Sequence, residues 1–148
     1  MKIFLDANIL VSVLNKEYPL FTTTSRILSL ADKHNFTLYT SPVCLAVAFY
    51  FAEKKFKSVK AKSKIQILCQ HIRITSLNKS AVIKMLQSPA INDFEDGLEY
   101  YSAEESKCNC IITEDVGDFY FSKIEVLNSE GFFKKYLFKE KIISKRSH

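Results

Sequence analysis

Short apolar runs alternate along the chain with longer stretches that carry a helical pattern, and this alternation constrains the fold more than any other feature. The apolar runs cover residues 3–5, 36–40, 72–77, 110–113 and 124–127. The helical stretches cover residues 22–34, 42–56, 57–70, 78–88, 92–103 and 129–138. Strands separated by helices call for a parallel sheet covered on both faces, and right-handed crossovers restrict the topology to doubly wound forms. We therefore predict an α/β fold with a central, mostly parallel five-stranded sheet.

Polar residues mark where several of these helices begin. The hydroxyl run at 22–25 predicts the cap of the first of them, and Ser41, followed by proline, predicts the start of the second. Asn92 with Glu95 three residues later matches a capping box, and Ser129 predicts the start of the last helix. These signals set the expected boundaries of the helices.

The composition is that of one globular domain. Of 148 residues, 47% are hydrophobic and 25% are charged, and the mean hydropathy is -0.02. The sequence has only three glycines and contains no glycine-rich phosphate-binding loop. No apolar run reaches the roughly 18 residues of a membrane span. We expect a single domain over residues 1–138, a basic, flexible tail over residues 139–148, a cytoplasmic location and no membrane association.

Charge and cysteine content do not identify a function by themselves. Lys and Arg total 21 against 16 Asp and Glu, and the resulting net charge of +5 permits binding to phosphate polyanions without requiring it. The cysteines are Cys44, Cys69, Cys108 and Cys110. A lone C-x-C pair with no second pair and no nearby His is a poor zinc signal. Reduced thiols packed in apolar strands and helices are therefore expected.

Several acids and polar side chains follow, or lie just ahead of, the predicted strands. These residues are Asp6, Asn8, Asp96, Thr113, Asp115 and Asp118. In an open parallel sheet, ligands bind at the carboxyl ends of the strands, so acids from distant parts of the chain can converge on one edge. Converging carboxylates repel one another unless a cation lies between them, and oxygen ligands without His or Cys suit Mg²⁺ or Mn²⁺. Such a cation polarises a phosphoryl oxygen and activates water, as phosphodiester hydrolysis requires.

Each acid also has a purely structural interpretation. Asp6 can cap the helix that follows it, and Asp93 and Glu95 complement the dipole of the helix that begins beside them. Asp115 and Asp118 can be ordinary loop acids around a tight turn. Only their positions in space distinguish these interpretations from a metal site.

Four motifs occur in a characteristic order: IFLDANIL at residues 3–10, a Ser-Pro pair at 41–42, DFEDGL at 93–98 and IITEDVGDF at 111–119. In order and separation they resemble the motifs of PIN-domain nucleases, which include the toxins of VapBC-type toxin–antitoxin pairs. The resemblance covers nearly the whole chain. It implies a PIN-like three-layer α/β/α sandwich that cleaves RNA with Mg²⁺ or Mn²⁺ held by three or four acids.

The resemblance also implies a role for each polar residue. Asp6 matches the first family acid and Asp96 the third, while Asp115 and Asp118 cover the region of the fourth. Thr113 matches a hydroxyl position that often lies near the metal-bound water. We predict a cation held by Asp6, Asp96 and Asp118, water assisted or oriented by Asp115, and support from Asn8, which would orient Asp6, and from Thr113.

One position departs from the family pattern. The second family acid is usually a Glu in a run like S-P-x-x-L-A-E, but here that position holds Val47. Glu53 cannot replace it, because six residues rotate about 240° around a helix and point the side chain away. The loss of one carboxylate weakens the hold on a cation, so the site is either active on the remaining acids or impaired.

A basic segment lies in the middle of the chain. Six lysines fall within eleven positions that contain no acid: Lys54, Lys55, Lys57, Lys60, Lys62 and Lys64. Without opposing acids, the segment is not a lattice of i,i+4 ion pairs. It is either a surface that follows an RNA backbone, with Lys54, Lys55, Lys57 and Lys60 as the predicted contacts, or a solvated helix face.

Three functions are compatible with these features. The leading hypothesis is a metal-dependent endoribonuclease, the toxin of a toxin–antitoxin pair, with RNA as its substrate, an antitoxin covering the acidic edge and a homodimeric assembly. The second is a catalytically impaired PIN-like module that binds RNA or protein, which Val47 motivates. The third, a phosphoacceptor receiver-like domain, would need paired acids after the first strand, where Asp6 stands alone.

Overall fold

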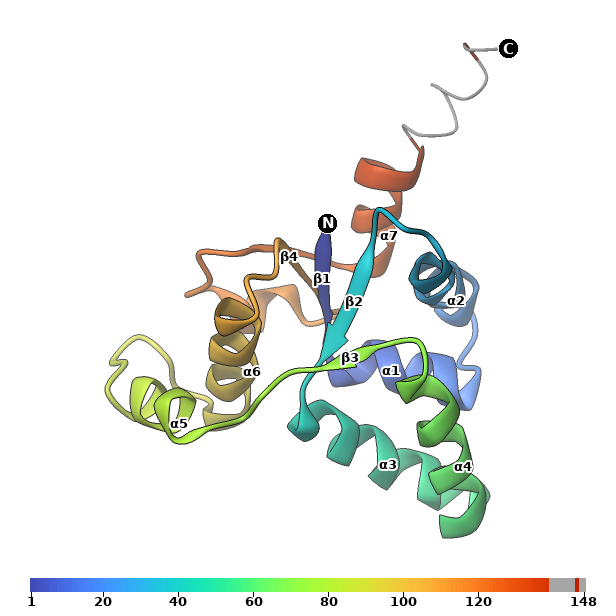
Figure 1. The fold of residues 1–148 in the computed structure, drawn as a ribbon, viewed down its shortest axis with the longest axis horizontal. Coiled ribbons are helices and arrows are strands. Elements are labelled where there is room, and N and C mark those ends of the chain that lie inside the picture. The colour runs from blue at the N-terminus through green and yellow to red at the C-terminus, as the bar shows by residue number, and fades with distance from the viewer. Residues whose placement is uncertain (139–145, 147–148) are drawn as a thin grey trace.

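The computed structural model describes residues 1–138 and 146 and contains a five-stranded sheet in which every neighbouring pair of strands is parallel. The strand order is β3-β2-β1-β4-β5 (Figure 1). The strands are β1 (Lys2–Leu5), β2 (Thr37–Thr40), β3 (Arg73–Ile74), β4 (Cys110–Ile112) and β5 (Glu125–Leu127). The chain moves from β1 toward one edge and then returns to the other side of β1, so the strand order reverses between β1 and β4. The predicted α/β fold with five parallel strands is confirmed.

Helices cover both sides of this sheet. They are α1 (Ala7–Asn15), α2 (Phe21–Leu28), α3 (Pro42–Phe56), α4 (Ser58–Cys69), α5 (Lys79–Leu86), α6 (Phe94–Glu105) and α7 (Ser129–Phe132). In Figure 1, α5 and α6 lie to one side of the sheet, and α2 and α4 lie to the other. Among the described residues, no helix is both long and apolar enough to cross a lipid bilayer.

The core lies around the two central strands. Ile3, Phe4 and Leu5 of β1 are at most 1% exposed, and all three residues of β4 are fully buried. Such continuous apolar runs are typical of parallel strands that are covered on both faces. The predicted strand at 72–77 is instead reduced to β3, whose two residues are exposed, because it pairs only with β2 at the edge of the sheet.

Two predicted helix starts are corrected by the structure. The helix expected over 22–34 is α2 followed by a 3₁₀ turn, η1 (Ser29–Asp32), and α2 has no side-chain cap. The Thr24 hydroxyl instead bonds with the Ser12 hydroxyl at 2.8 Å, on the neighbouring helix. At α6 the cap is Asp93 and not Asn92, because the Asp93 carboxylate accepts a hydrogen bond from the Asp96 amide at 3.0 Å. An ionised acid at this position also complements the helix dipole, which a neutral amide does not.

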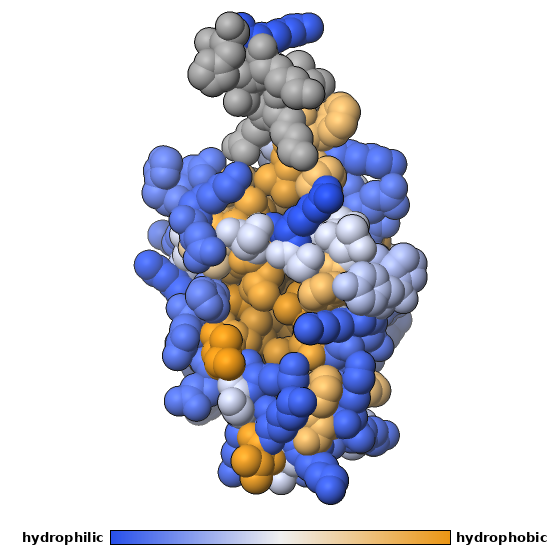
Figure 2. All heavy atoms as spheres, turned by 90° about the vertical axis from the view of Figure 1, so that its right-hand side faces the viewer, coloured by the Kyte–Doolittle hydropathy of each residue, from blue (hydrophilic) through white to orange (hydrophobic). Residues whose placement is uncertain are grey.

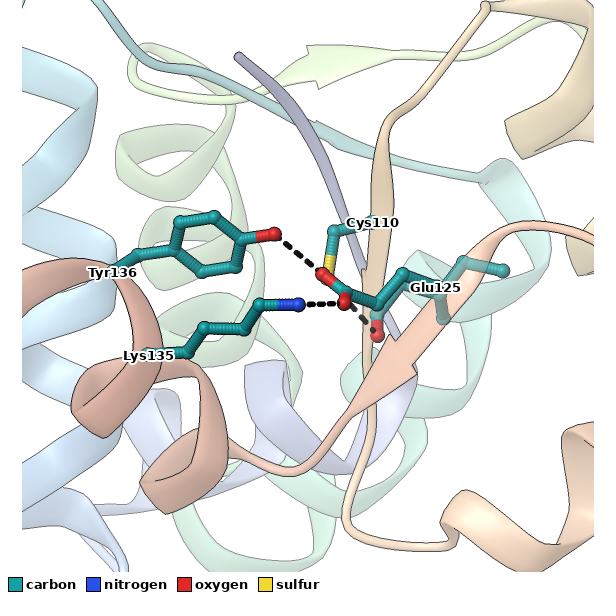
Figure 3. A network of polar contacts seen from close by, with 5 residues as sticks. Cys110, Glu125, Lys135 and Tyr136 are labelled. Atoms are coloured by element: carbon teal, nitrogen blue, oxygen red, sulfur yellow. Dashed lines mark hydrogen bonds and ion pairs between the residues drawn. The ribbon is translucent and has the colours of Figure 1, made fainter.

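The C-terminal part of the domain is attached to the sheet by polar contacts. The helix predicted over 129–138 is α7, capped by Asn128, followed by a π-helical turn, η3 (Phe133–Leu137). Tyr136 donates a hydrogen bond to Glu125 of β5 at 2.5 Å, and Lys135 forms an ion pair with the same carboxylate (Figure 3). Apart from residue 146, the predicted basic tail lies outside the described residues.

Candidate active site

A cleft of about 520 Å³ opens at the carboxyl ends of β1 and β4, where the strand order reverses. This is the position at which open parallel sheets bind ligands. The cleft residues that carry a carboxylate are Asp6, Glu17, Asp93, Glu95, Asp96, Glu114, Asp115 and Asp118. All four acids predicted from the sequence as catalytic are therefore brought to one cleft, although they come from separate segments of the chain.

Asp6 lies at the floor of the cleft and is only 8% exposed. One carboxylate oxygen accepts a hydrogen bond from the Ala7 amide at 2.6 Å, so Asp6 also caps α1, as its structural interpretation predicted. The other oxygen accepts a hydrogen bond from the Thr113 hydroxyl at 2.7 Å. Both contacts hold the carboxylate in one orientation, which leaves its remaining lone pairs available to a ligand.

Asn8 joins the loop after β4 to α1. Its amide nitrogen donates to the Thr113 hydroxyl oxygen at 3.1 Å and to the Asp115 carboxylate at 3.2 Å. Its carbonyl oxygen accepts from the Glu114 amide at 3.2 Å. The sequence predicted that Asn8 orients Asp6, but in the structure Asn8 reaches Asp6 only through Thr113, and it holds Asp115 directly.

Glu114 lines the cleft but is occupied by a structural contact. Its carboxylate accepts hydrogen bonds from both the amide and the hydroxyl of Ser129, at 3.0 and 2.5 Å. Ser129 begins α7, so Glu114 ties the loop after β4 to the C-terminal helix. Among the acids of this loop, Asp115 and Asp118 therefore remain the more available ligands.

The first turn of α6 forms the most acidic wall of the cleft. Asp96 is half-buried, and burial together with the negative charges of Asp93, Asp6, Asp118 and Glu95 raises its pKa to about 7. Burial, followed by the charges of Asp6 and Asp93, also raises the pKa of Glu95. These shifts follow first from burial and then from the crowding of carboxylates around each group.

Another acid, Glu99, lies beside Asp6. It is not among the four acids that the sequence predicted as catalytic. It is fully buried, and its burial and the nearby Asp6 raise its pKa to about 10. The Cys44 thiol of α3 donates to a Glu99 oxygen at 3.2 Å and lies 3.9 Å from an Asp6 oxygen. Helical spacing could have indicated Glu99 as a site residue, because it lies three residues after Asp96 and on the same side of α6.

Among the described residues, no basic side chain forms an ion pair with this group of acids. Within residues 1–138 and 146, the ion pairs involve Asp32, Glu130 and Glu125, none of which lines the cleft. One oxygen of Glu99 is buried and has no hydrogen-bond partner. Crowded oxygen donors with an unpartnered buried oxygen match what a hard divalent cation requires, so the residues present fit such an ion.

The cysteines match the expectation of thiols packed among apolar residues only in part, because the Cys44 thiol contacts the carboxyl groups of Glu99 and Asp6. All four are free, and Cys44, Cys108 and Cys110 are buried. Burial raises the pKa of Cys108 and that of Cys110 to about 12, so both stay as thiols at neutral pH.

The wall opposite α6 is formed by α3 and is apolar. Val47, at the position where the family pattern has its second acid, and Phe51 one turn later both line the cleft. Glu53 is exposed and is not among the residues that line the cleft, as its helical phase predicted. The departure from the family pattern therefore falls within the candidate site itself.

The predicted RNA-contacting lysines have different surroundings. Lys54 lies over the Tyr50 ring at 4.2 Å and over the Phe51 ring at 6.0 Å, beside the cleft. Lys55 donates to the Asn15 backbone carbonyl at 2.5 Å, which satisfies the C-terminal end of α1. Lys60 lies over the Phe56 ring, and Lys57 is exposed at the junction of α3 and α4. Lys54 is thus the lysine of this set that the structure links to the cleft.

Comparison with known proteins identifies the family. The family model described as PIN domain matches residues 2–117, so the chain belongs to the PIN domain family. The chain is 27% identical over 139 residues to ribonuclease VapC1 of Aquifex aeolicus (strain VF5), an alignment that spans 91% of this chain and 95% of that protein. The family resemblance predicted from the four motifs is confirmed, and the receiver-like hypothesis loses its support.

Solved structures of other proteins share this fold. VapBC2 from Rickettsia felis, bound to a DNA fragment from its promoter, has a TM-score of 0.64 at 21% identity and covers 86% of this chain and 98% of its own. VapC20 of Mycobacterium tuberculosis, a toxin that cleaves the Sarcin-Ricin loop, has a TM-score of 0.58 at 14% identity and covers 74% of this chain and 86% of its own. At these identities the likeness establishes the three-layer α/β/α fold.

Proposed function

We propose that this protein is a metal-dependent endoribonuclease and the toxin of a toxin–antitoxin pair. The observation that carries the proposal is that Asp6, Asp96, Asp115 and Asp118 line one cleft whose described lining residues include no basic side chain. Similarity to a ribonuclease along 91% of the chain supports RNA as the substrate. Mg²⁺ or Mn²⁺ fits the donor set, because every cleft ligand offered is a carboxylate, amide or hydroxyl oxygen.

The proposed roles of the residues follow from their contacts. Asp6, Asp96 and Asp118 hold the cation, which supplies Lewis-acid polarisation of the scissile phosphate and activation of a water molecule. Asp115 orients the attacking water, and Asn8 fixes Asp115 by the 3.2 Å hydrogen bond. Thr113 keeps Asp6 in orientation, since its hydroxyl proton is committed to the Asp6 carboxylate. Lys54 binds a phosphate of the RNA at the edge of the cleft.

A protein partner is part of the proposal. The solved neighbour VapBC2 supports an antitoxin as the partner, and covering of the cleft would block both cation and RNA. An apolar band runs along the face seen in Figure 2. On α4, Val59 and Ile67 are exposed apolar side chains. Exposed apolar patches of this kind are typical of protein interaction sites. The homodimer remains a prediction that light scattering on the purified protein would test.

Cleavage of a labelled RNA tests the proposed activity. Wild-type protein should cleave when Mn²⁺ or Mg²⁺ is added and should lose the activity in EDTA. Asp6→Asn should reduce the rate by at least roughly 100-fold while retaining the cap of α1, because Asn caps helices as well as Asp does. Asp32→Asn, an exposed acid outside the cleft, is the matched control and should retain wild-type activity. Equal cleavage by the Asp6 variant and wild type would overturn the proposal.

The alternative function is an impaired PIN-like module that binds RNA or protein. The observation that favours it is Val47 in the wall of the cleft, where the family pattern has an acid. This alternative predicts no cleavage at any Mn²⁺ concentration and Mn²⁺ affinity that is millimolar or weaker. RNA binding that persists in EDTA and is unaffected by Asp6→Asn would support it over the nuclease.

A further inference from the structure

The cleft lacks the carboxylate that position 47 would provide, yet another carboxylate lies close to Asp6. Val47 contributes only an apolar surface to the α3 wall. Glu99, on α6, is fully buried, and a carboxylic side chain is almost never buried in this way without a partner. Asp6 thus has a neighbouring carboxyl group, but this group comes from α6 and not from α3.

The position and contacts of the Glu99 carboxyl group are compatible with its acting as a ligand of a cation. Ligand atoms of Asp6, Cys44 and Glu99 lie within 4.8 Å of one another. The Cys44 thiol donates to one Glu99 oxygen at 3.2 Å and so fixes the orientation of the carboxyl group. The second oxygen of Glu99 is buried and has no hydrogen-bond partner. That unpartnered oxygen is the feature that points to a bound ligand.

In the part of the chain that the structure describes, no basic side chain balances the charge of Asp6 and Glu99. Among the described residues, neither Asp6 nor Glu99 takes part in an ion pair with Lys, Arg or His. Two carboxyl groups this close need either a proton shared between them or a cation beside them. A divalent cation satisfies both groups together with the acids at the mouth of the cleft.

We infer that Glu99 supplies to the cation the carboxylate that the family pattern places at position 47. The inference rests on the proposed function, because it requires a cation at Asp6. In this chain the carboxylate beside Asp6 comes from α6, whereas the family pattern has it on α3. Cys44, on α3, is the positioning residue that holds Glu99.

Mn²⁺ titration of the purified full chain, followed by electron paramagnetic resonance, tests this inference without an activity assay. Glu99→Gln preserves size and hydrogen bonding, and it should weaken Mn²⁺ binding by at least about tenfold. Introducing Val47→Glu should restore most of that loss in the Glu99→Gln background and change wild-type binding by less than about threefold. Val47→Gln, the neutral control, should restore nothing.

The double-mutant comparison separates a ligand from a mere support for Asp6. If Glu99 only positions Asp6, Val47→Glu strengthens Mn²⁺ binding equally in both backgrounds, and the inference is overturned. Wild-type affinity in Glu99→Gln overturns it as well, while the proposed function stands if Asp6→Asn still abolishes binding. If wild-type protein and Asp6→Asn bind Mn²⁺ equally weakly, the proposed function itself fails.

A second measurement requires no variant to fold. Crystals of wild-type protein soaked in Mn²⁺ should show an anomalous peak within coordination distance of a Glu99 oxygen as well as an Asp6 oxygen. A peak that contacts Asp6 and Asp96 but not Glu99 would contradict the inference and leave the nuclease proposal intact.

Discussion

The two helical walls of the cleft differ sharply in chemistry. The wall from α6 presents Glu95 and Asp96 in its first turn, beside the capping Asp93, whereas the wall from α3 presents Val47 and Phe51. The α6 wall is the N-terminal end of a helix, where backbone amides and the helix dipole stabilise negative charge. The α3 residues lie in its second and third turns, away from that end.

The comparison indicates that carboxylates are gathered at lower free-energy cost where a strand ends or a helix begins. Asp6 follows a strand and caps α1, Asp93 caps α6, and Asp96 lies just inside α6. Each carboxylate therefore has local stabilisation that offsets part of the repulsion among them. Val47 and Glu99 are each the sixth residue of their helices, α3 and α6, so neither position has such help. The Cys44 thiol holds Glu99 instead, by its hydrogen bond of 3.2 Å.

The largest effect is expected for the α6 wall itself. Asp96→Asn should reduce metal-dependent RNA cleavage on the order of 100-fold, because it removes a proposed ligand, as measured with a labelled RNA. The same variant should unfold at a higher temperature than wild type in EDTA, since it removes a charge that is half-buried and repelled by neighbouring acids. Glu95→Gln, the adjacent acid of the same wall, is the control and should lose less than about tenfold. A larger loss for Glu95→Gln would show that the wrong acid has been assigned.

A smaller effect is expected from pH on the metal-free protein. The pKa of Asp96 is raised from 3.8 to about 7, so between these values the folded state holds more protons than the unfolded state. Stability from this group is complete below about pH 4 and is lost as pH rises through 7. In EDTA, the unfolding temperature should fall by about 3 °C between pH 5 and pH 8, measured by circular dichroism.

The pH dependence of the unfolding temperature also tests whether the acids of the α6 wall destabilise the folded protein when they are ionised. Glu99, whose pKa is about 10, contributes in the same direction over this range. Asp96→Asn should flatten the slope, and so should saturating Mn²⁺, because the cation favours the ionised carboxylates. An unfolding temperature that rises from pH 5 to pH 8 would show that the acids are not crowded.

The smallest effect is expected at the outer edge of the α3 wall. Lys54→Gln should weaken RNA binding about threefold and lower the salt dependence of binding by roughly one ion, because Lys54 flanks the Phe51 ring at the cleft. Fluorescence anisotropy at several salt concentrations measures both quantities. Lys62→Gln, an exposed lysine of α4, is the matched control. Equal losses in the two variants would indicate a diffuse basic surface rather than a specific contact.

Much of the fold and part of the site could be predicted from local pattern. The alternation of strands and helices predicted the parallel sheet, because periodicity of buried residues is a property of neighbouring positions. Asp6 and Asp115 were predicted to lie at one edge, since each follows a strand and parallel strands end on the same side. Predicted helix starts were less reliable: Asn92 has the residue type of a cap, but Asp93 makes the bond.

The contacts within the site depended on segments that meet only in the folded chain. Asn8 binds Thr113, 105 residues away, and Cys44 binds Glu99, 55 residues away. Sequence alone determined the order of the strands and which acids follow them, because both are set by short-range periodicity. Tertiary packing decided that Asn8 holds Asp115, that Val47 lines the cleft, and that Glu99 is buried against Asp6. These outcomes depend on how helices from different crossovers approach one another, and no local pattern encodes that approach.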